Sequence, residues 1–213
     1  MKVNTKRVEN LIAEISPAKL VAATKYIGIE EIYELEKLGV TIFGENRVPS
    51  LLEKYDQYEG DGEFHMIGTL QTNKVKYIID KVSLIHSVDR TSLLQEIQKQ
   101  AKKHNIIMPV LLQVNIANER TKHGFQREEL LDIVNSLDTY QNIRVKGLMM
   151  MAPNDDLKKI EVYFKETRNL LEELQVKIPN ILLNELSMGM SNDYQLAIKY
   201  DATLIRIGRA LFK

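Results

Sequence analysis

The sequence predicts a single-domain α/β protein, a closed (β/α)8 barrel of the TIM type with an extra helix at its amino end. Eight short runs rich in Val, Ile and Leu recur along the 213 residues, and the segments between them carry apolar residues at helical steps of three and four. Parallel strands that helices cover read as nearly continuous apolar runs, so this alternation indicates βαβ units. No long linker, repeat or low-complexity stretch interrupts residues 1–213, which favours one closed barrel. An open, doubly wound sheet is the alternative.

The expected elements follow one another in a regular order. A helix comes first, with an apolar face formed by Val8, Leu11, Ile12 and Ile15. Two placements are open for it, a plug in the bottom of the barrel and a position outside. The expected strands are residues 20–25, 41–46, 63–68, 84–89, 108–115, 145–151, 181–187 and 203–208. The apolar faces of the intervening helices include Ile32, Leu35 and Leu38 before Gly39, then Leu94, Ile97 and Ala101, then Leu157, Ile160, Phe164, Leu171 and Leu174.

Composition and charge exclude several classes of partner and site. Lys plus Arg and Asp plus Glu both number 29, so the formal net charge is zero and no basic field attracts nucleic acid or an acidic membrane. The absence of cysteine excludes disulfides and a thiolate nucleophile, and scattered histidines do not predict a metal site. No run approaches the roughly 18 apolar residues of a membrane span, and the first residues lack a signal-peptide core. We expect a cytoplasmic protein without nucleic-acid or membrane partners.

Polar residues gather at the expected carboxyl ends of the strands, where (β/α)8 barrels place their chemistry. These residues are Lys25, Glu45, Asn46, Arg47, His65, Gly68, Ser87, Asp89, Gln113, Asn115, Met149 to Met151, Ser187 to Asp193, Arg206, Gly208 and Arg209. The last two segments combine Ser, Gly and small turns, which offer backbone N–H groups and hydroxyls to an anion. Because loops after strands seven and eight are the usual phosphate grip of such barrels, we expect a phosphate site there.

Lys25 ends the first expected strand, on the same face as Val21 and Ala23. A lysine on such a rim can act as a Schiff-base nucleophile. Beside a phosphate site it suggests a phosphorylated aldehyde, with pyridoxal 5′-phosphate (PLP) as the obvious candidate. Arg206, two residues before Gly208, is suited to address the pyridine nitrogen. Since an arginine there only donates, the nitrogen stays unprotonated and the ring is a weaker electron sink.

Six motifs of this chain resemble the motifs of one family and occur in the same order. They are "GENRV" (44–48), "FHMIGTLQTNK" (64–74), "HSVD" (86–89), "GLM" (147–149), "LSMGMSND" (186–193) and "RIGRALF" (206–212). The chain resembles the PLP homeostasis proteins, also called the YggS or PROSC family, over almost its whole length. The resemblance implies a barrel similar to the barrel domain of alanine racemase, with PLP on Lys25. It also implies a protein that binds and delivers PLP and balances its pool, with little or no catalytic activity.

The expected cofactor-binding residues follow from the strand ends and from this resemblance. They are Lys25, Asn46, His65, Ser187, Met188, Ser191, Arg206, Gly208 and Arg209. In this assignment Lys25 holds the aldehyde as a Schiff base, and Arg206 faces the ring nitrogen. The phosphate lies among Ser187, Ser191, Gly208 and Arg209.

The chain departs from the usual family pattern in four places. Thr24 replaces a Ser before the lysine, and the segment 26–28 replaces a Lys-Pro-like continuation. These two changes keep a hydroxyl and a flexible turn, so we expect little loss. Arg209 stands where a Thr is common; its backbone N–H can still serve the phosphate, but a hydroxyl is lost and a charge is added. Lys213 stands in place of a terminal Gly.

Other polar or flexible residues have simpler interpretations. His65 is as well suited to a structural hydrogen-bonded role as to acid–base work. Met149 to Met151 are expected to fill the barrel core, and Asp193 to favour a helix N-terminus. The charged loop 117–125 is expected to be solvated surface, although Lys122 or His123 could line the PLP route or receive PLP temporarily.

Three functions are compatible with these residues. The first is a non-catalytic PLP carrier and buffer that supplies apo PLP-dependent enzymes. The second is an amino-acid racemase with weak activity; it would need an acid or base on each face of the α-carbon, and the 213 residues leave no room for the second domain that alanine racemase uses. The third is a barrel aldolase that uses Lys25 on a phosphorylated sugar and binds no PLP.

Overall fold

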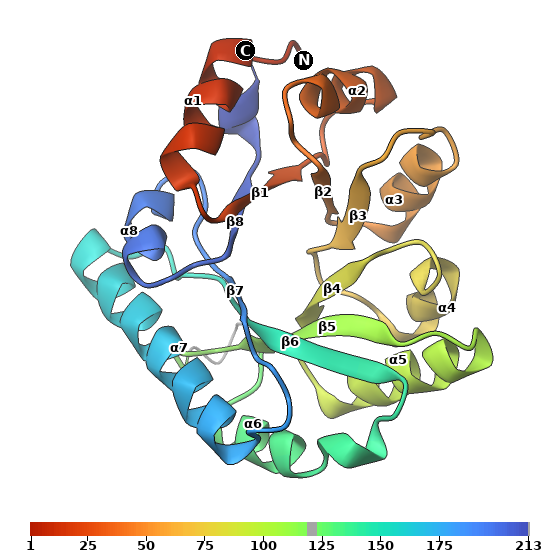
Figure 1. Cartoon of the computed structure of the whole chain (residues 1–213), viewed down its shortest axis with the longest axis vertical. Helices are drawn as coiled ribbons and strands as arrows, with labels where there is room; N and C mark the ends of the chain where they lie inside the picture. The colour runs from red at the N-terminus through yellow and green to blue at the C-terminus, as the bar shows by residue number, and fades with distance from the viewer. Residues whose placement is uncertain (119–122, 213) are drawn as a thin grey trace.

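The computed structural model describes residues 1–118 and 123–212 of the chain. Within them, eight parallel strands close a barrel in chain order, and the last strand pairs with the first (Figure 1). The strands are β1 (Lys19–Ala23), β2 (Ile42–Glu45), β3 (Glu63–Met66), β4 (Leu84–Val88), β5 (Met108–Val114), β6 (Ile143–Met150), β7 (Glu185–Ser187) and β8 (Leu204–Ile207). The predicted (β/α)8 barrel is confirmed. The open-sheet alternative is wrong, because β8 hydrogen-bonds to β1.

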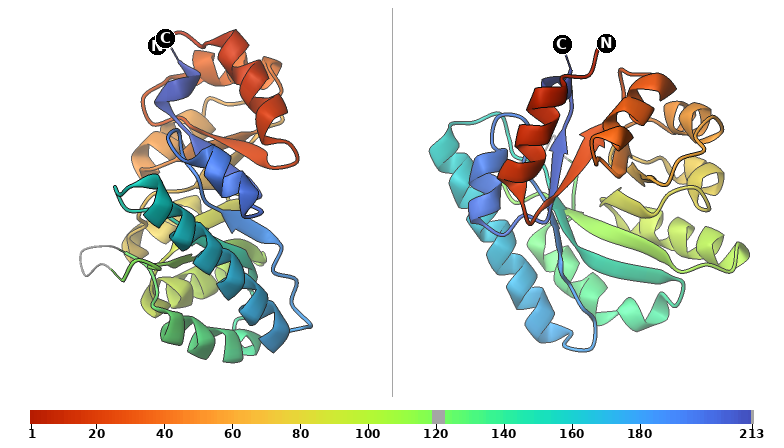
Figure 2. Two further views of the ribbon diagram at one scale, coloured as in Figure 1. Left: turned by 90° about the vertical axis from the view of Figure 1, so that its left-hand side faces the viewer. Right: turned by 45° about the horizontal axis from the view of Figure 1, so that its top comes forward.

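Helices surround the barrel on the outside (Figures 1 and 2). They are α1 (Thr5–Ile15), α2 (Ile29–Lys37), α3 (Val48–Tyr55), α4 (Val75–Ile78), α5 (Thr91–Lys103), α6 (Arg127–Asn135), α7 (Leu157–Lys177) and α8 (Tyr194–Lys199). Short 3-10 turns are η1 (Thr72–Lys74), η2 (Leu137–Thr139) and η3 (Arg209–Leu211). Among the described residues, no helix has the length and apolar character needed to cross a membrane.

The amino-terminal helix α1 completes the helical ring. It packs outside against β1 and η3, between α8 and α2 in Figure 1. The side chain of Asn4 caps it by accepting a hydrogen bond from the N–H of Arg7 at 3.4 Å, and its buried face comprises Val8, Leu11 and Ile15. The described residues after β8 form the 3-10 turn η3, and α1 covers the outside of the barrel beside this turn. The plug placement is therefore wrong and the outside placement is right.

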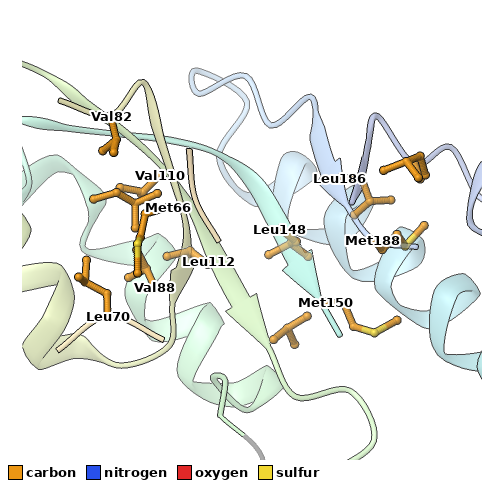
Figure 3. Packing of buried hydrophobic residues seen from close by; sticks show 14 of the residues in the cluster. Met66, Leu70, Val82, Val88, Val110, Leu112, Leu148, Met150, Leu186 and Met188 are labelled. Carbon is orange, nitrogen blue, oxygen red and sulfur yellow. The ribbon is translucent and has the colours of Figure 1, made fainter. Parts of the chain in front are cut away.

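The strands separate an outer from an inner core, as the two-residue period of side chains requires. The outer core lies between strands and helices; part of it is drawn in Figure 3, including Met150 and Met188. The inner core fills the barrel with Val21, Ile42, Ile67, Leu84, Leu111, Met149 and Leu204. The prediction that the Met149–Met151 run fills the core is right for Met149 and Met150. It is wrong for Met151, which follows the strand end and is 46% exposed.

Two local differences from the predicted elements have clear causes. The strand expected at 181–187 is only Glu185–Ser187, because the side chain of Gln175 on α7 takes the backbone partners upstream. Its Nε2 donates to the carbonyl of Ile181 at 2.8 Å, and its Oε1 accepts from the N–H of Leu183 at 2.7 Å. Leu157, expected on a buried face, is the first residue of α7 and 59% exposed.

Candidate functional site

Lys25 lies two residues after the end of β1, in the turn at the carboxyl end of the barrel, and its side chain is exposed. Its Nζ lies 4.5 Å from the centroid of the Tyr26 ring, a cation–π distance. The neighbouring strand β8 pairs Arg206 with Val21 and Ile207 with Ala22. The chain segments after β1 and β8 therefore emerge side by side, which brings Lys25 to the same edge as Gly208 and Arg209.

A buried polar cluster lies beneath the turn that carries Lys25. The ammonium of Lys54 on α3 forms an ion pair with Oε1 of Glu45 and donates to the carbonyl of Thr24 at 2.5 Å. The hydroxyl of Thr24 donates to the same Glu45 oxygen at 2.5 Å. All three side chains are buried. The cluster fixes the backbone immediately before Lys25 and explains why position 24 needs a hydroxyl.

Lys54 is a functional-site residue that the sequence analysis missed. A lysine on an amphipathic helix usually lies in solvent, and Lys54 belongs to helix α3 and not to the end of a strand. One signal was present, because Lys54 follows Val48 and Leu51 at steps of three and therefore shares their buried face.

The loop after β7 forms a tight turn that presents Ser191. Gly189 has φ +91°, and a Cβ there would lie 2.6 Å from Cβ of Ala197, so only glycine fits without strain. The carboxylate of Asp193 accepts a hydrogen bond from the N–H of Met190 at 2.5 Å and directly precedes α8. Burial raises the pKa of Asp193, while the charge of Arg206 acts in the opposite direction. Asp193 thus stands at a helix N-terminus, as predicted, and Ser191 is exposed at the rim.

Backbone donors are available where the sequence predicts a phosphate site. Within residues 1–118 and 123–212, no backbone hydrogen bond outside the helices and strands is donated by Ser191, Gly208 or Arg209. Gly208 precedes η3, and its carbonyl accepts from the N–H of Leu211 at 2.9 Å. Unpaired N–H groups of this kind bind anions. This donor set, with the Ser191 hydroxyl, fits the phosphate of PLP.

Arg206 lies inside the barrel and is held at two points. One guanidinium nitrogen donates to Oγ of Ser187 at 2.6 Å, and the other terminal nitrogen donates to the carbonyl of Met150 at 2.9 Å. Burial lowers the pKa of Arg206 to about 10, while the carboxylate of Asp193 raises it. The group therefore stays charged at neutral pH and keeps further N–H groups for a ligand.

The structure does not bring His65 to the carboxyl-end rim. His65 is the third residue of β3, buried in the interior, and lines a cavity of about 180 Å³ at the amino ends of the strands. Its Nδ1 lies 2.9 Å from Nε2 of His86, whose Nδ1 lies 2.9 Å from Oγ of Ser187. His65 therefore reaches Arg206 only through other side chains, and Ser187 has its hydroxyl engaged by both Arg206 and His86.

The other half of the rim contains a hollow of about 310 Å³. Asn46, Gly68, Gln113, His123 and Tyr163 are among its lining residues. A Cβ on Gly68 would lie 2.3 Å from the carbonyl oxygen of Asn46, which explains the glycine in the 64–74 motif. His123 lies 3.2 Å from the buried carboxylate of Asp89 and is exposed. Lys122, the other candidate in this loop, and Lys213 lie outside the described residues.

The structure thus gathers most of the predicted site residues at one edge. Lys25, Ser191, Gly208 and Arg209 lie on the arc formed by the ends of β7, β8 and β1, with Arg206 beneath them, and Asn46 lies in the adjacent hollow. The side chain of Met188 is fully buried in the outer core (Figure 3), so a rim ligand would reach only its backbone.

Comparisons with known proteins show which family this chain belongs to. A family model described as the N-terminal domain of alanine racemase matches residues 1–213. The chain is 45% identical over 197 residues to the pyridoxal phosphate homeostasis protein of Aquifex aeolicus, covering 92% of this chain and 86% of the relative. It is 39% identical over 199 residues to the protein of the same name from Helicobacter pylori, covering 92% and 87%.

Solved structures extend the similarity to the fold. PipY of Synechococcus elongatus, with PLP bound, superposes with a TM-score of 0.92 at 31% identity, over 98% of this chain and 99% of that chain. The alanine racemase of Streptomyces lavendulae shares the fold alone, with a TM-score of 0.83 at 15% identity over 97% of this chain and 56% of that chain. The chain therefore belongs to the alanine racemase N-terminal domain family and, within it, to the pyridoxal phosphate homeostasis proteins.

Proposed function

We propose that this protein binds PLP at the carboxyl-end rim and acts as a carrier and buffer that maintains the intracellular pool of this cofactor. The observation that carries the proposal is the combination of an exposed Lys25 amine with unpaired N–H donors of Ser191, Gly208 and Arg209 on the same rim. PLP has an aldehyde and a phosphate, which match these two kinds of group. PipY, the structural relative with PLP bound, supports the same ligand.

Each residue of the rim has a definite part in this proposal. PLP supplies an aldehyde that a lysine amine binds covalently and reversibly, and Lys25 is the amine. The N–H groups of Gly208 and Arg209 and the hydroxyl of Ser191 hold the phosphate. The hydroxyl of Ser187 is already engaged by His86 and Arg206. Ser187 therefore supports Arg206 and does not bind the phosphate. Asn46 borders the ligand from the adjacent hollow.

Arg206 favours carriage over catalysis. Its guanidinium has no acceptor atom and stays protonated, so it can only donate to the pyridine nitrogen. A ring nitrogen that receives a hydrogen bond and stays unprotonated withdraws electrons weakly, which makes the cofactor a poor catalyst of carbanion chemistry. The exposed position of Lys25 gives water access to the linkage, as release requires. Transfer to apo PLP-dependent enzymes, in the cytoplasm, is the final part of the proposal.

The racemase alternative has weaker support. The racemase of Streptomyces lavendulae shares only the fold, and this chain covers 56% of it. Racemisation needs an acid or base on each face of the α-carbon, and Lys25 offers one. The aldolase alternative has no support from the relatives, whose names refer to PLP.

The visible absorption spectrum of the purified protein tests the proposal. Wild type incubated with PLP is expected to show the band of lysine-bound PLP, and Lys25→Ala is expected to lack it with an unchanged circular dichroism spectrum. Lys19→Ala is the matched control, because Lys19 is an exposed lysine at the opposite end of the same strand. A wild type without the band would refute PLP binding. Measurable inversion of amino-acid chirality would replace the carrier by a racemase.

A further inference from the structure

A row of polar side chains, the first four joined by hydrogen bonds, crosses the interior of the barrel from one end to the other. It starts at Arg206 on β8, passes through Ser187 on β7 and His86 on β4, and continues to His65 and Glu63 on β3. The successive distances are 2.6 Å, 2.9 Å, 2.9 Å and, for Nε2 of His65 to Oε2 of Glu63, 3.7 Å. We call these five residues the interior relay. The inner apolar residues around it provide no competing partners.

Arg206 sets the direction of every hydrogen bond in the interior relay. A guanidinium only donates, so Oγ of Ser187 accepts from it. The Ser187 hydroxyl is fully buried, and its hydrogen bonds among the described residues are to Arg206 and His86 alone. Because a buried hydroxyl hydrogen without an acceptor is costly, the hydroxyl donates to Nδ1 of His86.

The two histidines continue the same donor-to-acceptor direction. A neutral imidazole that accepts at Nδ1 carries its proton on Nε2, so His86 donates to Nδ1 of His65. His65 in turn carries its proton on Nε2, which faces the carboxylate of Glu63. All links agree with one direction, from the charged donor Arg206 to the charged acceptor Glu63. The interior relay therefore requires the Nε2–H tautomer at both histidines.

The charges around the interior relay agree with this protonation state. Burial, then the neighbouring His65 and Arg206, hold the pKa of His86 well below its usual range, so His86 is neutral. The neighbouring His65 is the first cause that lowers the pKa of Glu63, which keeps this carboxylate ionised. At the amino end, the cavity that contains Glu63 also has Lys19, Lys146 and Glu185 in its lining. At the other end, Asp193 is the charged group that acts on Arg206.

We propose that His86 and His65 are positioning residues for Arg206. Through the Ser187 hydroxyl they hold the guanidinium in one orientation, with its remaining N–H groups directed to the ring-nitrogen position of the rim. His86 acts directly on Ser187, and His65 acts one link further away by fixing the tautomer of His86. The effect on PLP rests on the proposed function, whereas the direction of the hydrogen bonds does not.

Nitrogen-15 NMR of the imidazole rings in the PLP-free protein tests the direction. His86→Asn and His65→Asn assign the two signals among the four histidines of the chain. Both rings are expected to carry their proton on Nε2 at neutral pH, with Nδ1 unprotonated. A proton on Nδ1 of either ring would overturn the proposal, whatever the protein does with PLP.

A pair of substitutions at one position tests the positioning role. In His86→Asn the amide oxygen takes the place of Nδ1 and still accepts from Ser187, whereas in His86→Gln the amide takes the place of Nε2 and leaves Ser187 without its acceptor. His86→Gln is expected to bind PLP about tenfold more weakly, the effect of one lost hydrogen bond, with a shifted absorption band. His86→Asn is expected to stay close to wild type. His65→Leu should show a smaller shift than His86→Gln, and His65→Asn should restore the wild-type spectrum.

The control separates positioning from general destabilisation. Ile97→Ala opens a cavity in the outer core on α5, outside the barrel interior that holds the interior relay, so it should lower stability and leave the PLP band in place. Equal spectra for His86→Asn and His86→Gln, or a shift in Ile97→Ala as large as that in His86→Gln, would overturn the positioning role. A wild type that binds no PLP would refute the proposed function instead, and the tautomers measured by NMR would still decide the direction of the interior relay.

Discussion

Two lysines near the end of β1 have opposite environments. Lys25 is exposed, with the Tyr26 ring near its amine, whereas Lys54 is buried, paired with Glu45 and bonded to the carbonyl of Thr24. The buried lysine fixes the backbone that presents the exposed one. The contrast shows how a carrier site can combine a rigid support with an accessible reactive amine, since the structural charge and the binding charge are separate groups.

Substitution of Lys54 should have the largest effect on stability. Lys54→Met keeps much of the side-chain volume but leaves the Glu45 carboxylate buried without its ammonium partner, and Oε2 of Glu45 already has no hydrogen-bond partner among the described residues. Removing one partner of a buried ion pair costs about 3–5 kcal/mol. Urea unfolding of Lys54→Met should show a loss of that order.

Lys25→Met is the matched comparison for this prediction. An exposed lysine that leaves no buried partner should change the free energy of unfolding by no more than about 0.5 kcal/mol. Equal losses for the two variants would contradict the division between a structural and a binding lysine. The double variant Lys54→Met/Glu45→Leu should recover part of the loss, because it removes the uncompensated carboxylate.

The next largest expected effect is that of His86 on the free energy of unfolding, and it depends on pH. Its pKa is lowered in the folded protein, so above about pH 6.5 the folded and unfolded states both hold it neutral and it contributes nothing. As pH falls below this value, the unfolded state takes up the proton first, and the free energy of unfolding should fall by up to about 1.4 kcal/mol per pH unit. Unfolding in urea between pH 7.5 and about pH 5 measures the slope.

A shallower slope is expected for His86→Asn, which has no group to protonate in this range. His104→Asn is the control, because it removes an exposed histidine that does not belong to the interior relay. A wild-type slope that His86→Asn does not alter would mean that the acid sensitivity comes from other groups. It would also weaken the case for a neutral His86 in the interior relay.

The barrel and the exposed Lys25 could be predicted from the sequence, whereas the buried Lys54 was missed, and the reasons are physical. Alternating apolar runs predicted the barrel because the periods of strands and helices differ, and strand ends predicted Lys25, Ser191 and Gly208 because barrel chemistry gathers there. Strand alternation alone could not reveal that His65 meets His86. That contact depends on the register between β3 and β4, which pairs His65 with Leu84, and on barrel closure, which brings Ser187 within reach.

Arg209→Thr should have the smallest effect, and it sharpens the assignment of the phosphate site. The side chain of Arg209 is exposed, so its charge should contribute about 0–1 kcal/mol to phosphate binding, and a threonine hydroxyl could contribute a hydrogen bond of about the same size. The PLP affinity should therefore change by less than about fivefold. The dependence of affinity on salt is the more sensitive measurement, because the charge is screened at high ionic strength and the hydrogen bond is much less so.

Arg144→Thr is the control for this last experiment, because Arg144 is an exposed arginine near the amino end of β6. Its removal changes the net charge equally but lies at the far end of the barrel. If Arg209→Thr flattens the salt dependence and Arg144→Thr does not, the guanidinium of Arg209 acts locally on the phosphate. This action adds to that of the backbone N–H at position 209, which arginine and threonine both have. If Arg209→Thr lowers the affinity more than about tenfold, the side chain is a principal phosphate ligand and the unpaired N–H groups are not sufficient. That result would mean that one exposed side chain, and not the backbone of the turn after β8, provides most of the binding energy for the phosphate.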